Sequence, residues 1–280
     1  MDDTTILGIS AKKQGGKGTS CNFMLGAYMS HIGLITEDEY KDDTLLKSKG
    51  TFTITSKGEL WVSNIDGNTA YQGIFDYERD NDTMREFKRT RLDPYIKIYS
   101  FADMLKRNVC MNVLGLTYEQ CYGTDADKET VTHLCWENMP ENQGKHGFMT
   151  AREVMQFVGT DLFRKMYGNV WVDATIRQIK KDKPVIAIAG DCRFPNEVDG
   201  VHTAGGKVIR YTRAPFAGQD EHLSENALNE KVFDQNKFDA ILDNSNSTIS
   251  QQNKMLYNVL TTWGMIPTMR MPSIEEQDPK

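Results

Sequence analysis

The chain has 280 residues, of which 39% are hydrophobic and 26% are charged, and its formal net charge is −6. This length accommodates one α/β domain with insertions or two small domains, and the composition is that of a soluble globular protein. The acidic balance leaves no basic face of the kind that DNA or RNA binding requires, so we do not expect a nucleic-acid polymer as substrate.

The absence of targeting signals and the spacing of the cysteines indicate the cellular compartment in which we expect the protein. The sequence has no charged leader followed by an apolar stretch and no apolar run of about 18 residues, which predicts a cytoplasmic protein that is neither exported nor membrane-spanning. The cysteines are odd in number and are never spaced C-x-x-C, which predicts free thiols in a reducing compartment and argues against a zinc site. They are Cys21, Cys110, Cys121, Cys135 and Cys192.

The first predicted elements are a strand over Thr4–Ile9, a glycine-rich loop and a helix whose apolar residues recur at helical spacing from Cys21 to Ile32. In this context, glycines let backbone N–H groups converge on phosphate oxygens. The helix N-terminus adds partial positive charge and a lysine adds a full one. The segment therefore predicts a site for a nucleotide polyphosphate. Its loop residues are Gly15, Gly16, Lys17, Gly18 and Thr19.

The loop departs from the general phosphate-loop pattern at two positions. Ala11 stands where the first glycine is expected, and Gly18 stands where Ser or Thr should follow the lysine. The hydroxyl comes one residue later, at Thr19, which gives the order G-K-G-T found in adenylate-kinase-like enzymes. The alternative interpretation is a glycine-rich turn with a solvated lysine.

An insertion at about 36–94 precedes the second predicted strand. Within it, Gly50–Ser63 alternates apolar and polar residues on both sides of a Lys57-Gly58 turn, which predicts a β-hairpin. The stretch Asp76–Asp93 is highly charged, and we expect it to be exposed. The last residues, 265–280, carry prolines and an acidic run and are predicted to form a tail without a stable fold of its own.

Strands alternate with helices along the rest of the chain, which predicts a five-stranded parallel sheet with right-handed crossovers and helices on both faces. The four further strands are Tyr95–Phe101, Pro184–Ala189, Lys207–Thr212 and Phe238–Leu242. The helical stretches are Ala151–Lys165, Trp171–Lys180 and Ser247–Trp263, the last beginning at a Ser cap and stopping at Gly264. Ligands of such sheets lie beyond the carboxyl ends of the strands.

Polar residues follow several of these strands. Asp191 comes just after a buried strand and is suited to hold Mg²⁺ or its water shell, and Arg193 can clamp a phosphoryl group. The segment Ala102–Lys106 opens a helix whose N-terminus can receive a second anion. The irregular segment 214–237 is placed where a nucleotide kinase keeps its mobile lid. Taken one at a time, each residue is better explained as a cap, a turn or a surface charge.

Taken together, several blocks in the same order resemble the deoxynucleoside monophosphate kinases of tailed bacteriophages, distant relatives of adenylate kinase. The blocks are AKKQGGKGTS, SFADMLK, YGTDADKET, AREVMQFVGTDLF, GDCRFPNEVDG with GGKVIRYTR, DEHLSE and ILDNSNSTI. They cover most of residues 4–260. The resemblance implies one P-loop kinase domain over 1–264, with an acceptor-binding region at 102–150 and a lid-like segment at 214–237.

The resemblance also implies roles for individual residues. Donor phosphates would be held by Lys13, Gln14, Gly15, Gly16, Lys17, Gly18 and Thr19, with Asp243 and Asn244 near the donor base. The acceptor nucleotide would meet Ala102, Lys106, Arg152, Gly159, Thr160, Trp171, Asp191, Arg193 and Glu197. The reacting centre would contain Lys17, Asp191 and Arg193, with Glu197 beside them. The lid would carry Arg213, His222 and Glu225, and the metal ligands would be Thr19 and Asp191. A core tryptophan is the alternative for Trp171.

The activity that the resemblance implies is phosphoryl transfer from ATP, with Mg²⁺, to a deoxynucleoside 5′-monophosphate, which supplies phage DNA synthesis. The partners implied are small nucleotides, and a homodimer stays open. Two alternatives remain. One is another small-molecule kinase on this scaffold, of the phosphomevalonate or dephospho-coenzyme A type. The other is a nucleotide-dependent regulatory module without turnover, which has little need of the strand-end Arg193.

Overall fold

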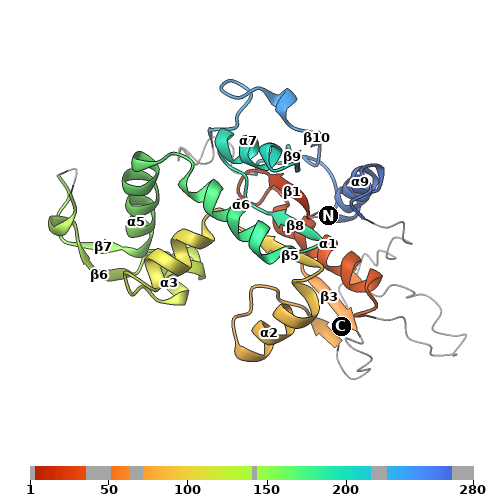
Figure 1. Ribbon diagram of the computed structural model, residues 1–280, viewed down its shortest axis with the longest axis horizontal. Helices are drawn as coiled ribbons and strands as arrows, with labels where there is room; N and C mark the ends of the chain where they lie inside the picture. The colour runs from red at the N-terminus through yellow and green to blue at the C-terminus, as the bar shows by residue number, and fades with distance from the viewer. Residues whose placement is uncertain (1–3, 36–51, 64–71, 141–143, 216–225, 267–280) are drawn as a thin grey trace, which may run out of the picture. The chain divides into compact units, whose positions relative to one another are not determined.

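The structure is a computed structural model that describes residues 4–35, 52–63, 72–140, 144–215 and 226–266 (Figure 1). The chain forms two compact units. Unit 1 combines the residues up to Tyr99 with those from Ile179 onward, and unit 2 is Ser100–Gln178. The prediction of a single kinase domain with insertions stays a prediction.

Unit 1 is built on a five-stranded parallel sheet with the strand order β10-β9-β1-β8-β5. All five predicted strands are confirmed, with small differences at their ends. The strands are β1 (Thr5–Ser10), β5 (Ile96–Tyr99), β8 (Ile186–Ala189), β9 (Lys207–Tyr211) and β10 (Ala240–Leu242). The apolar run of β8 is buried at every position, as expected for a strand inside a parallel sheet covered on both faces.

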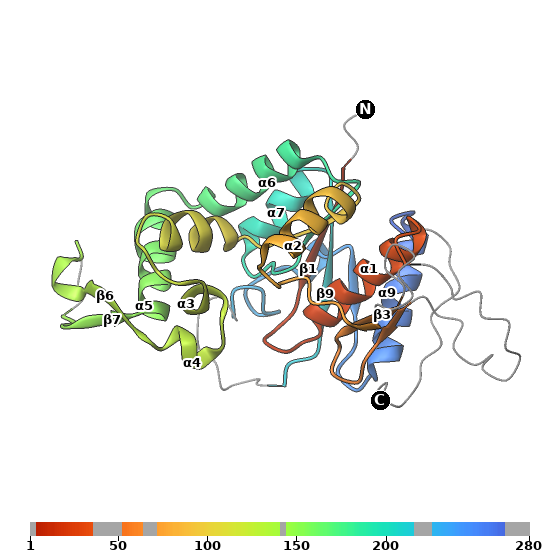
Figure 2. The same cartoon turned by 90° about the horizontal axis from the view of Figure 1, so that it is seen from below.

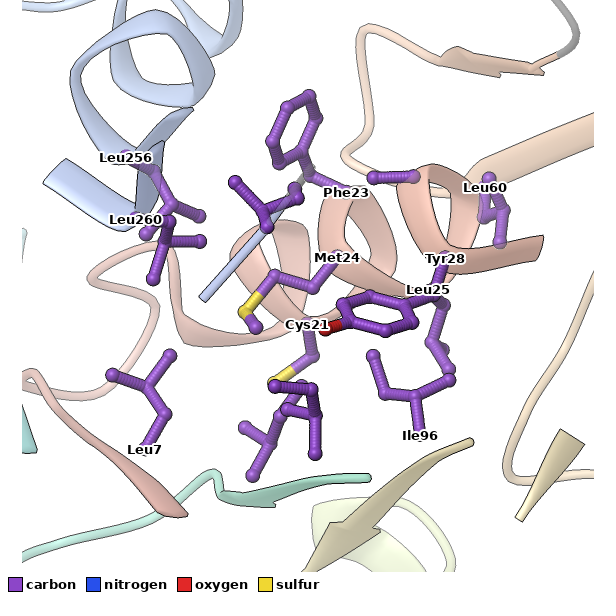
Figure 3. Packing of buried hydrophobic residues seen from close by; sticks show 14 of the residues in the cluster. Leu7, Cys21, Phe23, Met24, Leu25, Tyr28, Leu60, Ile96, Leu256 and Leu260 are labelled. Carbon is purple, nitrogen blue, oxygen red and sulfur yellow. The ribbon is translucent and has the colours of Figure 1, made fainter. Parts of the chain in front are cut away.

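Helices cover both faces of this sheet, as predicted (Figure 2). Alternation along β1 directs Leu7 and Ile9 into the core that α1 (Lys17–His31) and α9 (Ile249–Thr262) share. On the other face, Gly8 lies close to Val201 of α7 (Pro195–Thr203). Figure 3 shows the first of these cores, in which Met24 of α1, Leu256 and Leu260 of α9 and strand residues gather. The sheet is therefore fixed from both sides, and so is the loop that leaves β1.

The predicted hairpin is present in its described part. Strands β2 (Phe52–Ile54) and β3 (Leu60–Ser63) pair antiparallel, and a third strand, β4 (Gln72–Ile74), which the sequence did not predict, pairs with β3. The charged stretch that follows is not wholly exposed. It forms α2 (Asp82–Phe87) and the π-helical η1 (Lys88–Leu92), and Leu92 is completely buried in the main core. The prediction was wrong at Leu92 because one apolar residue can anchor an otherwise solvated segment.

The last helix begins one residue later than predicted. The side chain of Thr248, not that of Ser247, caps α9 by accepting a hydrogen bond from the backbone N–H of Gln251. Gln251 returns a bond to the Thr248 backbone, so the two residues form a capping box. The Ser247 hydroxyl instead donates to the backbone oxygen of Asp243, 3.4 Å away. Both residues could cap the helix, and the reciprocal bond from position N3 decides between them.

Unit 2 has its own apolar core, which includes Leu105, Trp136, Met149, Phe157 and Trp171. The predicted helix over Ala151–Lys165 is confirmed, although its second half is π-helical. The antiparallel pair β6–β7 was not predicted. The elements are η2 (Met104–Met111), α3 (Tyr118–Tyr122), α4 (Asp125–Lys128), β6 (Val131–Cys135), η3 (Trp136–Asn138), β7 (Phe148–Thr150), α5 (Ala151–Gln156), η4 (Phe157–Arg164) and most of α6 (Val170–Asp182).

Two further expectations concern cysteines and membranes. All five cysteines are free thiols, as predicted, and four of them are buried while Cys135 is half-buried. In the described part of the chain, no helix is long and apolar enough to cross a bilayer. A short 3₁₀ helix, η5 (Gln235–Lys237), lies between β9 and β10.

Candidate functional site

The loop between β1 and α1 turns sharply at the helix N-terminus. Gly16 has a left-handed backbone, with φ of +98°, and Gln14 also has a positive φ, of +54°. A Cβ on Gly16 would lie 2.4 Å from Oε1 of Gln252, so both the backbone and the space require glycine. The helix starts at Lys17 with no side-chain cap. Because no side chain caps this end of the helix, its first N–H groups and the helix dipole are suited to bind a phosphate.

Lys17 folds back over this loop. Its Nζ donates to the backbone oxygens of Ala11, 2.5 Å away, and Lys12, 3.1 Å away. The ammonium is therefore held inside the curve of the loop, next to the helix N-terminus that its own backbone begins. A phosphate group bound there would meet the lysine charge and the helix dipole together. Two other predicted phosphate ligands, Lys13 and Gln14, have exposed side chains on the same loop.

Asn244, which follows β10, holds the loop in place. Its Nδ2 donates to the Gly15 backbone oxygen at 3.0 Å and to Gln252 Oε1 at 2.7 Å, and its Oδ1 accepts from the Arg213 N–H at 2.9 Å. The side chain is completely buried. The sequence predicted that Asn244 approaches the donor base. In this structure its amide is fully engaged in holding the loop, so a base contact would require these bonds to break.

Three residues that the sequence analysis missed extend this network. Gln252 Nε2 donates to the Gly16 backbone oxygen and to Ser20 Oγ, both at 3.1 Å, and Ser20 Oγ lies 2.8 Å from the Tyr211 hydroxyl. Burial raises the pKa of Tyr211, so it stays a neutral hydrogen-bonding group. A glutamine on the apolar stripe of a predicted helix was the available signal for Gln252. Its partner could not be inferred because it lies 236 residues away along the chain.

The end of β8 carries the predicted Asp191, Arg193 and Glu197. Glu197 is buried, with 2% of its surface exposed, and its Oε2 accepts from the backbone N–H groups of Arg193 and Phe194 at 2.7 and 3.0 Å. This carboxylate therefore fixes the backbone at Arg193. The placement of Glu197 beside the reacting centre stays a prediction, but its contacts indicate a supporting position.

Lys17 and Asp191 converge on the same neighbourhood of unit 1. Burial above all, and then the negative charges of Glu78 and Asp191, raise the pKa of the Cys21 thiol to about 12, while Lys17 lowers it. Burial also raises the pKa of Cys192, Asp191 adds to this increase, and Lys17 opposes it. The Cys192 N–H donates to the Ile9 backbone oxygen at 3.0 Å, so the chain just after Asp191 lies beside the end of β1. A phosphate loop and the acid at the next strand end are brought together, as the sheet topology predicts.

A magnesium ion suits these residues better than a transition metal does. Within the described ranges, no group of three or more His, Cys, Asp and Glu side chains could hold a metal by itself. Mg²⁺ keeps several waters and binds through one or two protein oxygens plus substrate phosphates. The Thr19 hydroxyl and the Asp191 carboxylate are oxygen donors of that kind, so they fit the ion. Their role as ligands stays a prediction.

Asp243 closes a turn after β10. Its Oδ1 accepts from the hydroxyls of Ser245 and Thr212, both at 2.6 Å, and from the Ser245 N–H at 3.1 Å. These hydrogen bonds, that of Ser245 first, lower the pKa of the exposed Asp243 carboxyl to about 2. Because the carboxylate faces solvent, it remains accessible to a ligand, and its predicted contact with the donor base stays a prediction.

In unit 2, the predicted acceptor residue Arg152 is paired with two carboxylates. Its Nε donates to Glu129, and one of its terminal nitrogens lies 3.0 Å from Asp125. The Arg152 side chain is 36% exposed, and both carboxylates are more exposed than that. Lys106, also predicted for the acceptor, lies with Nζ 4.6 Å from the centre of the Tyr122 ring. Unit 2 thus presents cations on half-exposed side chains.

The remaining predicted acceptor residues differ in exposure. The Trp171 side chain is buried, and its Nε1 donates to the Gly159 backbone oxygen at 3.0 Å. A Cβ on Gly159 would lie 2.6 Å from Leu105, so Gly159 allows close packing. These contacts favour the alternative interpretation of Trp171 as a core residue. Thr160 is exposed and Ala102 is half-buried.

The predicted donor residues lie within unit 1, together with Asp191, Arg193 and Glu197 of the predicted acceptor set, and the other predicted acceptor residues lie within unit 2. Of the predicted lid residues, Arg213 contributes its backbone N–H to Asn244. His222 and Glu225 lie outside the described residues.

Comparison with known proteins gives a consistent match. The sequence model of a family described as deoxynucleotide monophosphate kinase matches residues 5–255. An Acanthamoeba polyphaga mimivirus protein, provisionally named deoxynucleotide monophosphate kinase, is 32% identical over 138 residues, covering 45% of this chain and 65% of that protein. A deoxynucleoside-5′-monophosphate kinase of Escherichia phage T5 is 29% identical over 113 residues, covering 34% of this chain and 42% of that protein. The chain spans less than two thirds of the length of these two relatives.

Proposed function

We propose, from the premise that this chain belongs to the deoxynucleotide monophosphate kinase family, that it transfers the γ-phosphoryl group of ATP to a deoxynucleoside 5′-monophosphate. The products are the deoxynucleoside diphosphate and ADP. The observation that carries the proposal is the loop between β1 and α1. There a left-handed Gly16, the helix N-terminus and the folded-back Lys17 surround one place for phosphate groups.

On the donor side, the loop contributes charge and fixed backbone. Lys17 exchanges its bonds to the Ala11 and Lys12 carbonyls for phosphate oxygens of ATP, so its charge lies between the donor phosphates. Asn244 and Gln252 hold the Gly15 and Gly16 carbonyls in place by donating a hydrogen bond to each from their side-chain N–H groups. The loop therefore does not have to reorganise when the donor binds.

A magnesium ion, when bound, neutralises charge on the donor phosphates. Thr19 and Asp191 are the residues that would hold it, directly or through its waters. This assignment is supported by the hydrogen bond from the Cys192 N–H to the Ile9 backbone oxygen, which brings the end of β8 beside the end of β1 that leads into the loop.

On the acceptor side, Arg152 would bind the monophosphate. Its guanidinium already pairs with Glu129 and Asp125, and a dianionic phosphate offers the same planar pair of oxygens with more charge. Lys106, Ala102 and Thr160 would line the same site. Because the existing ion pairs are half-exposed, replacing them costs little.

The chemistry needs no strong base. The acceptor phosphate is already a nucleophile at neutral pH, so the enzyme must bring two anions into line and neutralise the charge on the group in transfer. Arg193 would supply the neutralising positive charge, and Glu197 holds the backbone of Arg193 in place. The segment 214–237, with Arg213, His222 and Glu225, would exclude water that otherwise accepts the phosphoryl group.

A panel of acceptors in a coupled assay of ADP release tests this proposal. It contains dGMP, dTMP, dCMP, dAMP, the four ribonucleotides and hydroxymethylated pyrimidine deoxynucleotides, together with phosphomevalonate and dephospho-coenzyme A. We expect turnover with at least one deoxynucleotide, in excess over its ribonucleotide. Turnover only with phosphomevalonate or dephospho-coenzyme A, or ATP binding without turnover on any acceptor, would refute it.

Two variants at the end of β8 test the roles in unit 1. Arg193→Lys keeps the charge but loses the bidentate fork, so kcat should fall much more than the binding of either substrate changes. Asp191→Asn should shift the Mg²⁺ dependence. If both variants only lower Tm, with activity per folded molecule unchanged, the two residues are structural.

The proposal also covers the cellular compartment of the protein and its oligomeric state. Cytoplasmic localisation is supported by the five free thiols, which are typical of a reducing compartment. A homodimer and the restriction to small nucleotides stay predictions, and sedimentation with and without substrates tests the first.

A further inference from the structure

The tip of the β2–β3 hairpin lies against the first turn of α1. Gly58 occupies this tip with a φ of +81°, and a Cβ built on it would lie 2.2 Å from Thr19 Oγ1. Asn22, one turn further along α1, donates from Nδ2 to the Gly58 backbone oxygen at 2.9 Å. The hairpin therefore contacts the helix at the residue that we expect to serve the donor phosphates and their metal.

The rest of the hairpin is anchored on the same helix. The Phe52 ring lies on Gly26, where a Cβ would approach the ring to within 2.4 Å, and its centre is 6.0 Å from that of Phe23. Phe52, Leu60 and Val62 are all buried. Because α1 has no side chain at Gly26, the strands lie close to the helix, and the tip cannot lift without exposing this apolar contact.

The turn itself is tightly bonded. Gly58 N–H donates to the Thr55 backbone oxygen and Thr55 N–H to the Glu59 backbone oxygen, both at 2.9 Å. The buried Thr55 hydroxyl also accepts from the Glu59 N–H at 3.2 Å. These bonds, together with the left-handed Gly58, specify one shape for the tip. The contact with Thr19 is therefore made by rigid backbone, not by an adaptable side chain.

Thr19 has few ways to respond to such a contact. Its branched Cβ restricts χ1 on a helix to two main rotamers, which differ in where the hydroxyl points. Since its Oγ1 is the atom nearest to the Gly58 position, the space above Gly58 decides which rotamer is available. We propose that the hairpin tip is a positioning element of the donor site, in which Gly58 and Asn22 set the direction of the Thr19 hydroxyl toward magnesium-bound ATP. This inference rests on the proposed function.

The central test compares two glycines that have nearly the same positive φ. Gly205 has a φ of +82° and nothing within 4 Å of an added Cβ, whereas Gly58 has nearly the same φ and the collision with Thr19. Gly58→Ala and Gly205→Ala therefore pay similar backbone strain. Calorimetric titration should show that the Kd of ATP with Mg²⁺ rises about tenfold in Gly58→Ala and less than about twofold in Gly205→Ala. Equal Kd values for the two variants would overturn the inference.

A double-mutant cycle identifies Thr19 as the residue through which Gly58 acts. Thr19→Ala removes the hydroxyl and creates room for the new methyl group, so Gly58→Ala should have no further effect on Kd in that background. Independent, additive effects would instead show that Gly58→Ala acts through the general fold. Repeating the titration in EDTA should remove most of the difference between Gly58→Ala and the wild type. A difference that persists in full without Mg²⁺ would contradict the positioning of a metal-directed hydroxyl.

A second variant keeps the test decisive if Gly58→Ala does not fold. Asn22→Ala releases the hairpin tip without inserting an atom, and the Kd of ATP with Mg²⁺ should rise about two- to fivefold while the KM of the deoxynucleotide is unchanged. A folded Asn22→Ala with wild-type Kd would overturn the inference. Failure of the proposed function looks different, because the wild type would then show no turnover on any deoxynucleotide. A wild type that turns over, with variants that bind ATP equally well, refutes the hairpin role alone.

Discussion

The phosphate loop of unit 1 and the ion pairs of Arg152 with Asp125 and Glu129 in unit 2 differ in how far their polar groups are buried. Around the loop, the groups that hold the backbone are buried: Asn244 is fully inaccessible and Gln252 is 3% exposed. Around Arg152, the guanidinium and its partners Glu129 and Asp125 are exposed by a third or more. Buried polar networks are costly to break, whereas exposed ion pairs contribute about 0–1 kcal/mol.

This difference indicates a division of labour between the two groups. A loop that binds the same polyphosphate in every turnover benefits from fixed geometry, because preorganised donors need no rearrangement during transfer. A cation that must exchange carboxylates for an incoming phosphate benefits from ion pairs that take little free energy to break. The comparison predicts that variants near the loop change stability or chemistry strongly, and that variants near Arg152 change acceptor binding with little loss of stability.

The largest expected effect is on chemistry at the loop. Lys17→Ala should lower kcat by roughly 10³-fold or more, because it removes the charge between the donor phosphates. Tm should fall by only a few degrees, since the variant loses two partly buried hydrogen bonds, each worth about 1 kcal/mol. The matched control is Lys180→Ala, on an exposed position of α6, with unchanged kcat. A folded Lys17→Ala enzyme with more than about a tenth of wild-type kcat would show that the loop is misassigned.

The second effect is on stability. Asn244→Ala leaves the Gly15 carbonyl and the Arg213 N–H without their buried partner and should cost about 2–3 kcal/mol of unfolding free energy. Thermal unfolding should show this as a Tm lower by about 5–10 °C. Asn246→Ala, at an exposed position of the same turn between β10 and α9, serves as the control. Equal Tm values for the two variants would mean that the buried network does not hold the loop.

The third effect separates the two regions most directly. Arg152→Ala should raise the KM of the deoxynucleotide about ten- to a hundredfold, leave the KM of ATP unchanged, and alter stability by less than about 1 kcal/mol. Arg152→Lys, which keeps the charge but loses the fork, should fall between Arg152→Ala and the wild type. Equal changes in both KM values, or a large loss of Tm, would remove Arg152 from the acceptor site.

The smallest effect is a pH dependence. The folded pKa of Asp243, about 2, lies below its usual value of about 3.9, so the ionised form contributes stability above the usual value. That contribution disappears as the pH falls through the folded pKa. The Tm of Asp243→Asn should therefore lie below that of the wild type at pH 5, and the gap should close between about pH 4 and pH 2. A gap that stays constant over this range would contradict the hydrogen-bonded carboxylate.

The sequence predicted the elements whose signal is local. The strands of unit 1 follow from short apolar runs, and the loop follows from the glycines between β1 and α1. What it could not supply is long-range pairing. The partner of the Asn244 amide is the Gly15 carbonyl, 229 residues away, and nothing near Asn244 distinguishes a base contact from a loop contact. The burial of Leu92 and the pairing of β4 with β3 depend on distant segments in the same way.

The buried thiols of each unit allow the local opening of that unit to be measured by the rate of cysteine labelling. Cys21 and Cys192 belong to unit 1, and Cys110 and Cys121 to unit 2, and all four are buried. Because burial raises the pKa of Cys21 and of Cys110 to about 12, neither thiol reacts with a disulfide reagent until its surroundings open. The labelling rate of each cysteine therefore measures the local opening free energy of its unit. ATP should slow the labelling of the first pair, and a deoxynucleotide that of the second.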